Sequence, residues 1–136
     1  MIKIFEILNE LEIKSDVLRF RLSHGSTPRT QDFVALRNKV EVGLLIFEDW
    51  GTPFSFVYEV FVLQEARNDR IGSLLLSQAE MIAAKLGRSS IRLIPKSLCE
   101  EAMSDLALTT WYKRKGYIEC ASETGQLEKF LFPSPP

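Results

Sequence analysis

The segment EARNDRIGSLLL, residues 65–76, changes character halfway along its length. Its first six residues are charged and turn-prone, its last six are apolar and helix-forming, and Gly72 lies near the junction. A helix start exposes unpaired backbone N–H groups and a partial positive charge, which together favour a bound phosphate. Gly72 has no Cβ, so an anion can come close, and Arg67 and Arg70 add donors that suit phosphate geometry. The segment therefore predicts a cradle for a diphosphate.

The same segment also has a purely structural interpretation. Asn68 or Asp69 would cap the helix with a side-chain oxygen, and the two arginines would be solvated. A motif of this length is weak on its own, so the surrounding sequence has to decide between the two interpretations.

Outward from this segment, the pattern predicts a strand before it and a helix after it. FSFVYEVFVL, residues 54–63, is dense in aromatic and β-branched residues and is typical of a buried strand. From Ile71 to Leu86 the apolar residues recur at the spacing of a helix with one apolar face. Gly87 stands where a left-handed C-cap belongs.

The remaining segments complete an alternation of strands and helices. Residues 1–14 fit either a strand followed by a helix or one amphipathic helix, and VLRFRLSH, residues 17–24, alternates like a strand. The other predicted elements are two strands in 33–50 with a turn near Arg37 to Lys39, a strand at 90–94, a helix opened by a capping box at 97–100, a helical stretch with Trp111 and Tyr112 that stops at Gly116, and two strands in 117–132. This order predicts an α/β (α+β) fold with a mixed sheet and helices packed on it.

Composition limits the classes of function. The chain has 136 residues and a formal net charge of −1, which predicts a single domain over residues 1–136 without bulk attraction to nucleic acid or membrane. Residues 132–136 are expected to form a loose tail. Two cysteines, Cys99 and Cys120, and the single His24 give no metal-site pattern, so we expect no metal and reduced thiols. No apolar run approaches the ~20 residues of a membrane span, and we expect a cytoplasmic protein.

Two short motifs then resemble one known family. Arg67-Asn-Asp-Arg70-Ile-Gly72 resembles the R/Q-x-x-G-x-G/A signature of the GCN5-related N-acetyltransferase (GNAT) superfamily, which follows the fourth strand there as it follows FVYEVFVL here. TWYKRKGY, residues 110–117, resembles the family's second marker, aromatic-Tyr-x-x-x-Gly-aromatic, near the end of the fourth helix. The resemblance covers residues 40–132, and the short N-terminal region matches poorly. Arg70 stands where the family usually has its first glycine, where it would either crowd the diphosphate or bind it.

The resemblance implies a fold and an activity. The fold would be a largely antiparallel sheet of six to seven strands flanked by helices and splayed between strands 4 and 5. The activity would be acetyl-coenzyme A dependent N-acetyltransfer, by direct attack of a primary amine of a small molecule or peptide in a ternary complex. The expected coenzyme-binding residues are Phe61, Val62 and Leu63 for the pantetheine arm, and Arg67, Asn68, Asp69, Arg70, Ile71, Gly72 and Ser73 for the diphosphate.

Two residues are expected to carry the chemistry. Tyr112 matches the family tyrosine that protonates the leaving thiolate, and a phenol with a pKa of about 10 can do so. Its alternative role is packing beside Trp111. Glu59, an acid inside an apolar strand, would be the general base, because burial would raise its pKa towards a useful value. Its alternative role is that of a solvent-facing residue or of a partner to an arginine.

Other classes of function stay open at this stage. One is a non-catalytic acetyl-coenzyme A-binding or interaction module of the same fold, which Arg70 and the short N-terminal region favour. Another is a structural αβ domain in which the motif is coincidental. In the family, two helices between the first two strands usually build the acceptor site, and this chain has little room for them before residue 33. An open acceptor groove would suit a protein partner or a homodimer.

Overall fold

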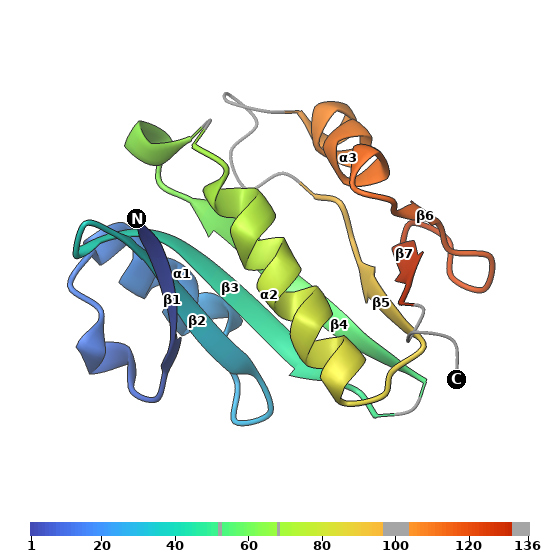
Figure 1. Ribbon diagram of the computed structural model, residues 1–136, viewed down its shortest axis with the longest axis horizontal. Helices are drawn as coiled ribbons and strands as arrows, with labels where there is room; N and C mark the ends of the chain where they lie inside the picture. Colours follow the sequence, from blue (N-terminus) through green and yellow to red (C-terminus); the bar gives the residue numbers. More distant parts are fainter. Residues whose placement is uncertain (52, 68, 97–103, 132–136) are drawn as a thin grey trace.

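The structure, a computed structural model, describes residues 1–51, 53–67, 69–96 and 104–131 (Figure 1). Its elements in chain order are β1 (Ile2–Ile7), η1 (Glu10–Glu12), α1 (Asp16–Gly25), β2 (Gln31–Arg37), β3 (Val40–Asp49), β4 (Phe54–Val62), η2 (Gln64–Ala66), α2 (Ile71–Lys85), β5 (Ser90–Leu93), α3 (Asp105–Arg114), β6 (Ile118–Glu119) and β7 (Leu127–Phe130). The predicted capping box at 97–100, Cys99 and the predicted tail at 132–136 lie outside the described residues.

The described strands form one seven-stranded sheet with the order β1-β2-β3-β4-β5-β7-β6. Every neighbouring pair is antiparallel except β4 and β5, which run parallel because α2 connects them as a crossover. This confirms the mixed, largely antiparallel sheet flanked by helices that the sequence predicted.

The helices cover the two faces of the sheet unequally. Alternation along β3 sends Leu45 to the face that packs against Leu75 of α2, and Leu44 to the face that packs against Leu18 of α1. Trp111 and Tyr112 place α3 on the same side as α2. Figure 1 shows α1 behind β1 to β3, and Arg21 of α1 reaches the second half of β4, where it pairs with Glu59.

Strand β4 loses its partner on one side halfway along its length. Phe54–Val57 pairs with Ser90–Leu93 of β5, and β4 then continues to Val62 without further pairing to β5. The register against β3 shifts at the same place, so that Tyr58 is the extra residue of a β-bulge. This confirms the predicted splay between the fourth and fifth strands, and places a bulge at the point where the two strands separate.

The prediction of a strand at residues 17–24 was wrong, because this segment is part of α1. Ser15 caps the helix by accepting a hydrogen bond from the N–H of Leu18. Only Leu18 and Leu22, four residues apart, are buried, whereas Phe20 between them is 58% exposed. The alternating pattern therefore included an exposed aromatic residue, and the true period was that of a helix.

The first fourteen residues follow the strand alternative in part. β1 forms an edge strand paired with β2, so the single amphipathic helix was wrong. The helix expected after the strand shrinks to η1, where the Asn9 side chain accepts from the N–H of Leu11. Leu8 and Leu11 remain exposed, because this single turn has no apolar face to bury.

Candidate functional site

The N-terminus of α2 presents backbone donors at the open end of β4. In the described part of the chain, none of the N–H groups of Ile71, Gly72 and Ser73 donates a hydrogen bond, and the first helical bond runs from Leu74 N to Arg70 O at 3.0 Å. No described side chain caps this helix. Such a terminus carries free donors and a partial positive charge, as an anion requires.

Two side chains of the expected cradle have partners of their own. The Arg67 Nε donates to the carbonyl of Val62 at 3.2 Å, and the guanidinium lies 5.9 Å from the centre of the Phe61 ring. Asp69 is paired with Arg37 at 2.6 Å, so its negative charge is neutralised beside the helix terminus. Asn68 lies outside the described residues.

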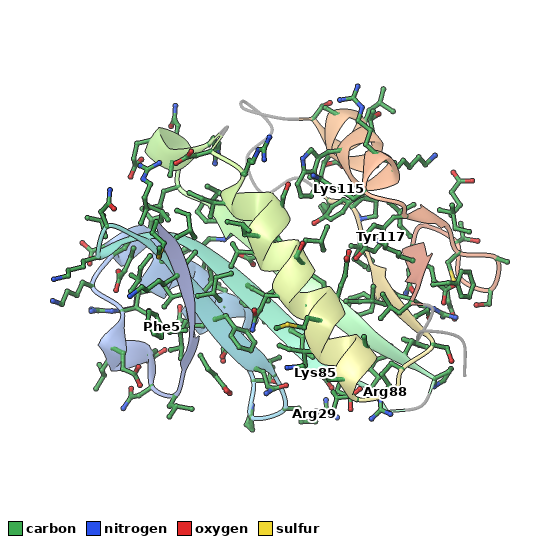
Figure 2. All side chains as sticks on the ribbon, in the orientation of Figure 1. Phe5, Arg29, Lys85, Arg88, Lys115 and Tyr117 are labelled. Carbon is green, nitrogen blue, oxygen red and sulfur yellow. The ribbon has the colours of Figure 1, made fainter. Side chains whose placement is uncertain are left out.

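Arg70 borders a pocket of about 350 Å³ over the first turns of α2, which is lined by Arg70, Ser73, Leu74, Ser77 and Lys115. The lining contains two cations and two hydroxyl groups and no acid, a composition that suits a phosphate. Figure 2 shows Lys115 beside the N-terminal half of α2. The sequence analysis did not assign Ser77 or Lys115 to the site. The spacing of Ser73 and Ser77, one helical turn apart, was the available signal.

The backbone of Arg70 explains the glycine that the family has at this position. Arg70 has a φ of 62° and a ψ of 11°, in the left-handed region that favours glycine. The arginine side chain extends from this conformation into the edge of the pocket. The left-handed backbone thus suits the glycine that the resemblance implies here, and Arg70 adds a cation at this position.

Arg70→Gly is expected to stabilise the fold by about 1 kcal/mol, because glycine relieves the left-handed strain. The same change is expected to weaken coenzyme A binding several-fold, because a cation leaves the pocket. Thermal melting and calorimetric titration measure the two effects. Arg70→Ala is the matched control, since it removes the charge without the conformational gain. Equal melting temperatures for the two variants would contradict the assigned backbone conformation.

Only alternate residues at the end of β4 direct their backbone N–H and C=O groups away from β3. The N–H of Leu63 donates to the Val42 carbonyl of β3, and by strand alternation the polar backbone groups of Phe61 also face β3. Those of Val60 and Val62 face the side from which β5 has departed. Of the three residues expected to pair with pantetheine, Val62 is therefore the one that faces the gap, and Val60, which the sequence analysis did not identify, joins it.

Tyr112 is a buried phenol, with 5% of its surface exposed, within the cluster that contains Val57 and Leu93. Its ring makes an edge contact with Tyr117, at 5.7 Å between centroids. The Tyr117 hydroxyl donates to Glu80 at 2.8 Å, whereas no hydrogen bond of the Tyr112 hydroxyl occurs within the described ranges. Burial raises the pKa of Tyr112 well above its ordinary value, so the phenol keeps its proton.

Trp111 connects this tyrosine to the helix terminus. A Cβ built on Gly72 would lie 3.6 Å from Cζ2 of Trp111 and 3.7 Å from Cγ2 of Val62. Trp111 also makes an edge contact with Tyr112, at 4.9 Å between ring centroids. Gly72 at the start of α2 therefore lies next to Val62 of β4 and next to Trp111, the ring that contacts Tyr112.

Glu59 follows the bulge and faces α1. Its Oε2 accepts from Arg21 Nε at 2.9 Å, and 10% of its side chain is exposed. The structure thus shows the arginine partner that the sequence analysis named as the alternative to a base. Its other oxygen, Oε1, lies 3.7 Å from a Cβ built on Gly25.

The described residues give two further results. None of their helices has both the length and the hydropathy of a membrane span. Among the same residues, no group of three or more His, Cys, Asp or Glu side chains could hold a metal ion.

The family described as "Acetyltransferase (GNAT) domain" matches residues 28–119, which is more than half of the chain. A search of curated protein sequences found no match.

Solved structures resemble the whole chain at low sequence identity. An acetyltransferase of the GNAT family from Staphylococcus aureus Mu50 has 19% identity and a TM-score of 0.68, with 97% of this chain and 100% of that chain covered. A GNAT family acetyltransferase from Elizabethkingia anophelis, solved with acetyl-CoA bound, has 14% identity and a TM-score of 0.65, with 96% and 98% covered. A KacTA–DNA complex has 11% identity and a TM-score of 0.71, with 96% and 94% covered. At such identities the likeness shows the fold alone.

Proposed function

Because this chain belongs to the acetyltransferase (GNAT) domain family, we propose that it transfers an acetyl group from acetyl-coenzyme A to a primary amine of a small molecule or peptide. The observation that carries the proposal is the coincidence of two features at one end of β4. The strand loses β5 after Val57, and the N-terminus of α2, which no described side chain caps, follows the same strand. Residues 1–136 would act as one such unit in the cytoplasm, without nucleic acid, membrane or metal.

The residues present fit acetyl-coenzyme A, which would supply an activated acyl group. Ile71, Gly72 and Ser73 would donate backbone N–H groups to its diphosphate, and the pocket with Arg70 and Lys115 would hold further phosphate oxygens. The backbone groups of Val60 and the N–H of Val62 would pair with the pantetheine amides in the manner of an added strand, since the Val62 carbonyl already accepts from Arg67.

Proton transfer would come from two side chains, Tyr112 and Glu59. Tyr112 holds a proton that can pass to the leaving thiolate, and its hydroxyl lacks a competing acceptor among the described residues. Glu59 would take the proton of the attacking amine, directly or through water, after Arg21 gives way or by its second oxygen. Two functional groups of opposite protonation state would then serve one reaction centre.

The Arg21–Glu59 ion pair also favours the second candidate, a non-catalytic acetyl-coenzyme A-binding or interaction module, because the guanidinium occupies a carboxylate oxygen that a base would need. In that case the coenzyme would bind and the acetyl group would stay on it. The coenzyme-bound form would then bind a protein partner or a second copy of the chain.

Thermal melting with acetyl-coenzyme A, followed by thiol release with a panel of amines, tests both candidates. A ligand at 100 times its dissociation constant stabilises a protein by about 2.7 kcal/mol, so binding gives a measurable shift. We expect this shift together with amine-dependent release of coenzyme A. A shift without thiol release would support the non-catalytic module, and no shift with either acetyl-coenzyme A or coenzyme A would contradict both.

A further inference from the structure

A second pocket, of about 500 Å³, opens at the C-terminal end of β3, away from the N-terminus of α2. Its lining is formed by Arg29, Glu48, Asp49, Trp50 and Tyr58. Figure 2 shows Arg29 at the end of the molecule far from Lys115. The volume falls within the range of small-molecule sites.

Aromatic rings form one wall of this pocket. Trp50 stacks on Phe56, with 4.8 Å between ring centroids and 8° between planes, and Tyr58 tilts against Phe56 at 5.0 Å. Phe56 is buried beneath them, but Trp50 is 46% and Tyr58 is 47% exposed. The pocket therefore offers solvent-exposed surface of two rings whose positions are fixed by a buried third. Such surfaces attract organic cations as well as apolar groups.

The two carboxylates of the pocket differ in how well their charges are compensated. Asp49 accepts from Nε and Nη2 of Arg88, both at 2.7 Å, and from Ser55. The hydrogen bond from Arg88 is the largest cause that lowers the pKa of Asp49 to about 2. Asp49 is therefore a fully paired charge, which leaves Glu48 as the carboxylate that can bind a ligand.

Glu48 is buried, with 8% of its surface exposed, and accepts from the Tyr58 hydroxyl at 3.0 Å. Among the described residues its ion-pair partner is Arg29, which lies 3.8 Å from it and has a side chain that is 84% exposed. Because Arg29 is largely exposed and lies at the outer limit of an ion pair, it contributes little and is a displaceable counterion. A buried carboxylate next to two aromatic rings then favours a cation that lies closer to it than Arg29 does.

The pocket also adjoins the expected reaction centre. Tyr58 is the bulged residue of β4, Glu59 is its neighbour, and pairing with β5 ends at Val57. If the diphosphate of the coenzyme binds at the N-terminus of α2, the pantetheine arm would run along β4 and place the acetyl group near this bulge. A second substrate would have to approach from the sheet face that carries Tyr58 and Glu48.

We propose that this pocket admits the acceptor, and that the acceptor is an organic ammonium whose charge replaces Arg29 at Glu48 while its carbon skeleton lies on Trp50 and Tyr58. The assignment of the bound cation as acceptor rests on the proposed function. The recognition of a cation does not, because it follows from Glu48 and the two rings.

Benzyltrimethylammonium, which cannot be acetylated, tests this recognition by quenching of Trp50 fluorescence. The chain has two tryptophans, so Trp111→Phe leaves Trp50 as the sole reporter. In that background we expect saturable quenching by benzyltrimethylammonium and weaker binding of benzoate, an anion of similar size. Glu48→Gln should weaken cation binding roughly tenfold, and Arg29→Ala should strengthen it several-fold, because one removes the attraction and the other a competing cation.

Glu6→Gln and Lys3→Ala, exposed on the edge strand β1, are the charge-matched controls and should leave binding unchanged. Stronger binding of benzoate, or unchanged cation affinity in both pocket variants, would overturn the proposal. Arg29 is exposed, so Arg29→Ala decides the matter even if Glu48→Gln fails to fold.

Acetyl transfer is measured separately on the unmodified chain and on the same two pocket variants. A KM for cationic amines that rises in Glu48→Gln and falls in Arg29→Ala supports the acceptor assignment. Thiol release with a KM that neither variant changes would refute the pocket and keep the proposed function. Cation binding with the expected variant pattern, but without thiol release from any amine, would refute the proposed function and keep the cation site.

Discussion

Tyr112→Phe is expected to lower turnover by about 10²–10⁴-fold while the affinity for coenzyme A stays nearly unchanged. The variant removes one hydroxyl group and keeps the ring that contacts Trp111 and Tyr117. That hydroxyl has no hydrogen-bond partner among the described residues, so within them its loss breaks no hydrogen bond. Steady-state kinetics at saturating acetyl-coenzyme A, together with calorimetric titration of coenzyme A, separate the two quantities.

Tyr117→Phe is the matched control, because its phenol lies in the same cluster but donates to Glu80. Loss of that hydrogen bond should lower the free energy of unfolding by about 1–2 kcal/mol with little change in turnover. The two variants should thus show opposite patterns, one in activity and one in stability. Turnover that survives in Tyr112→Phe would remove this tyrosine from the chemistry.

The pH dependence of turnover gives an independent check on Tyr112. Burial raises the pKa of Tyr112, so the phenol stays protonated throughout the range in which a free tyrosine would ionise, near pH 10. No alkaline decline in kcat from this group is therefore expected below about pH 10. A decline that vanishes in Tyr112→Phe would show that the phenol is more exposed to water than its burial implies.

The sequence predicted the central part of this fold because local and tertiary signals agreed there. Residues 54–63 had β-branched and aromatic residues on both faces, and Ile71 to Leu86 had a helical apolar stripe closed by Gly87, which has a φ of 78°. The turn near Arg37 to Lys39 was also correct, and Asn38 and Lys39 both have positive φ. These elements are buried on at least one side, so the spacing of their apolar residues indicates their secondary structure.

The N-terminal prediction failed where exposed apolar residues imitated a strand. Phe20 contributed to the alternation in residues 17–24, yet it is mostly exposed and makes a tilted contact with His24, at 4.2 Å between ring centroids. A residue that is apolar but unburied gives a false period, and a single sequence does not tell which apolar residues are buried. The resulting helix α1 occupies part of the region where the family resemblance implied two helices.

The sequence predicted those parts of the candidate site that are built from consecutive segments of the chain. The α2 terminus and the edge of β4 follow directly from a strand, a turn and a helix in sequence. The bulge at Tyr58, the Arg21–Glu59 pair and the pocket at Glu48 arise between elements that are distant in the chain. Such contacts depend on strand register, which the local pattern of one sequence does not specify.

Gly72→Glu is expected to weaken coenzyme A binding by roughly a hundredfold, or about 2.7 kcal/mol, without loss of the fold. A carboxylate at this position would accept from the free N–H groups at the start of α2 and would repel the diphosphate. The fold should survive, because an acidic residue in the first turn stabilises a helix. Calorimetric titration of coenzyme A and thermal melting of the free protein measure the two effects.

Two neighbouring variants separate charge from bulk at this glycine. Gly72→Ala should bind coenzyme A nearly normally, because its Cβ would meet Trp111 and Val62 at 3.6–3.7 Å, which is ordinary van der Waals contact. Alanine also has a higher helix propensity than glycine by about 1 kcal/mol, so the melting temperature should rise. Gly72→Gln has the bulk of glutamate without its charge and should fall between the two in affinity. If all three variants bind coenzyme A as tightly as the parent chain, the diphosphate binds elsewhere, and the start of α2 is a structural helix end whose free N–H groups are satisfied by water.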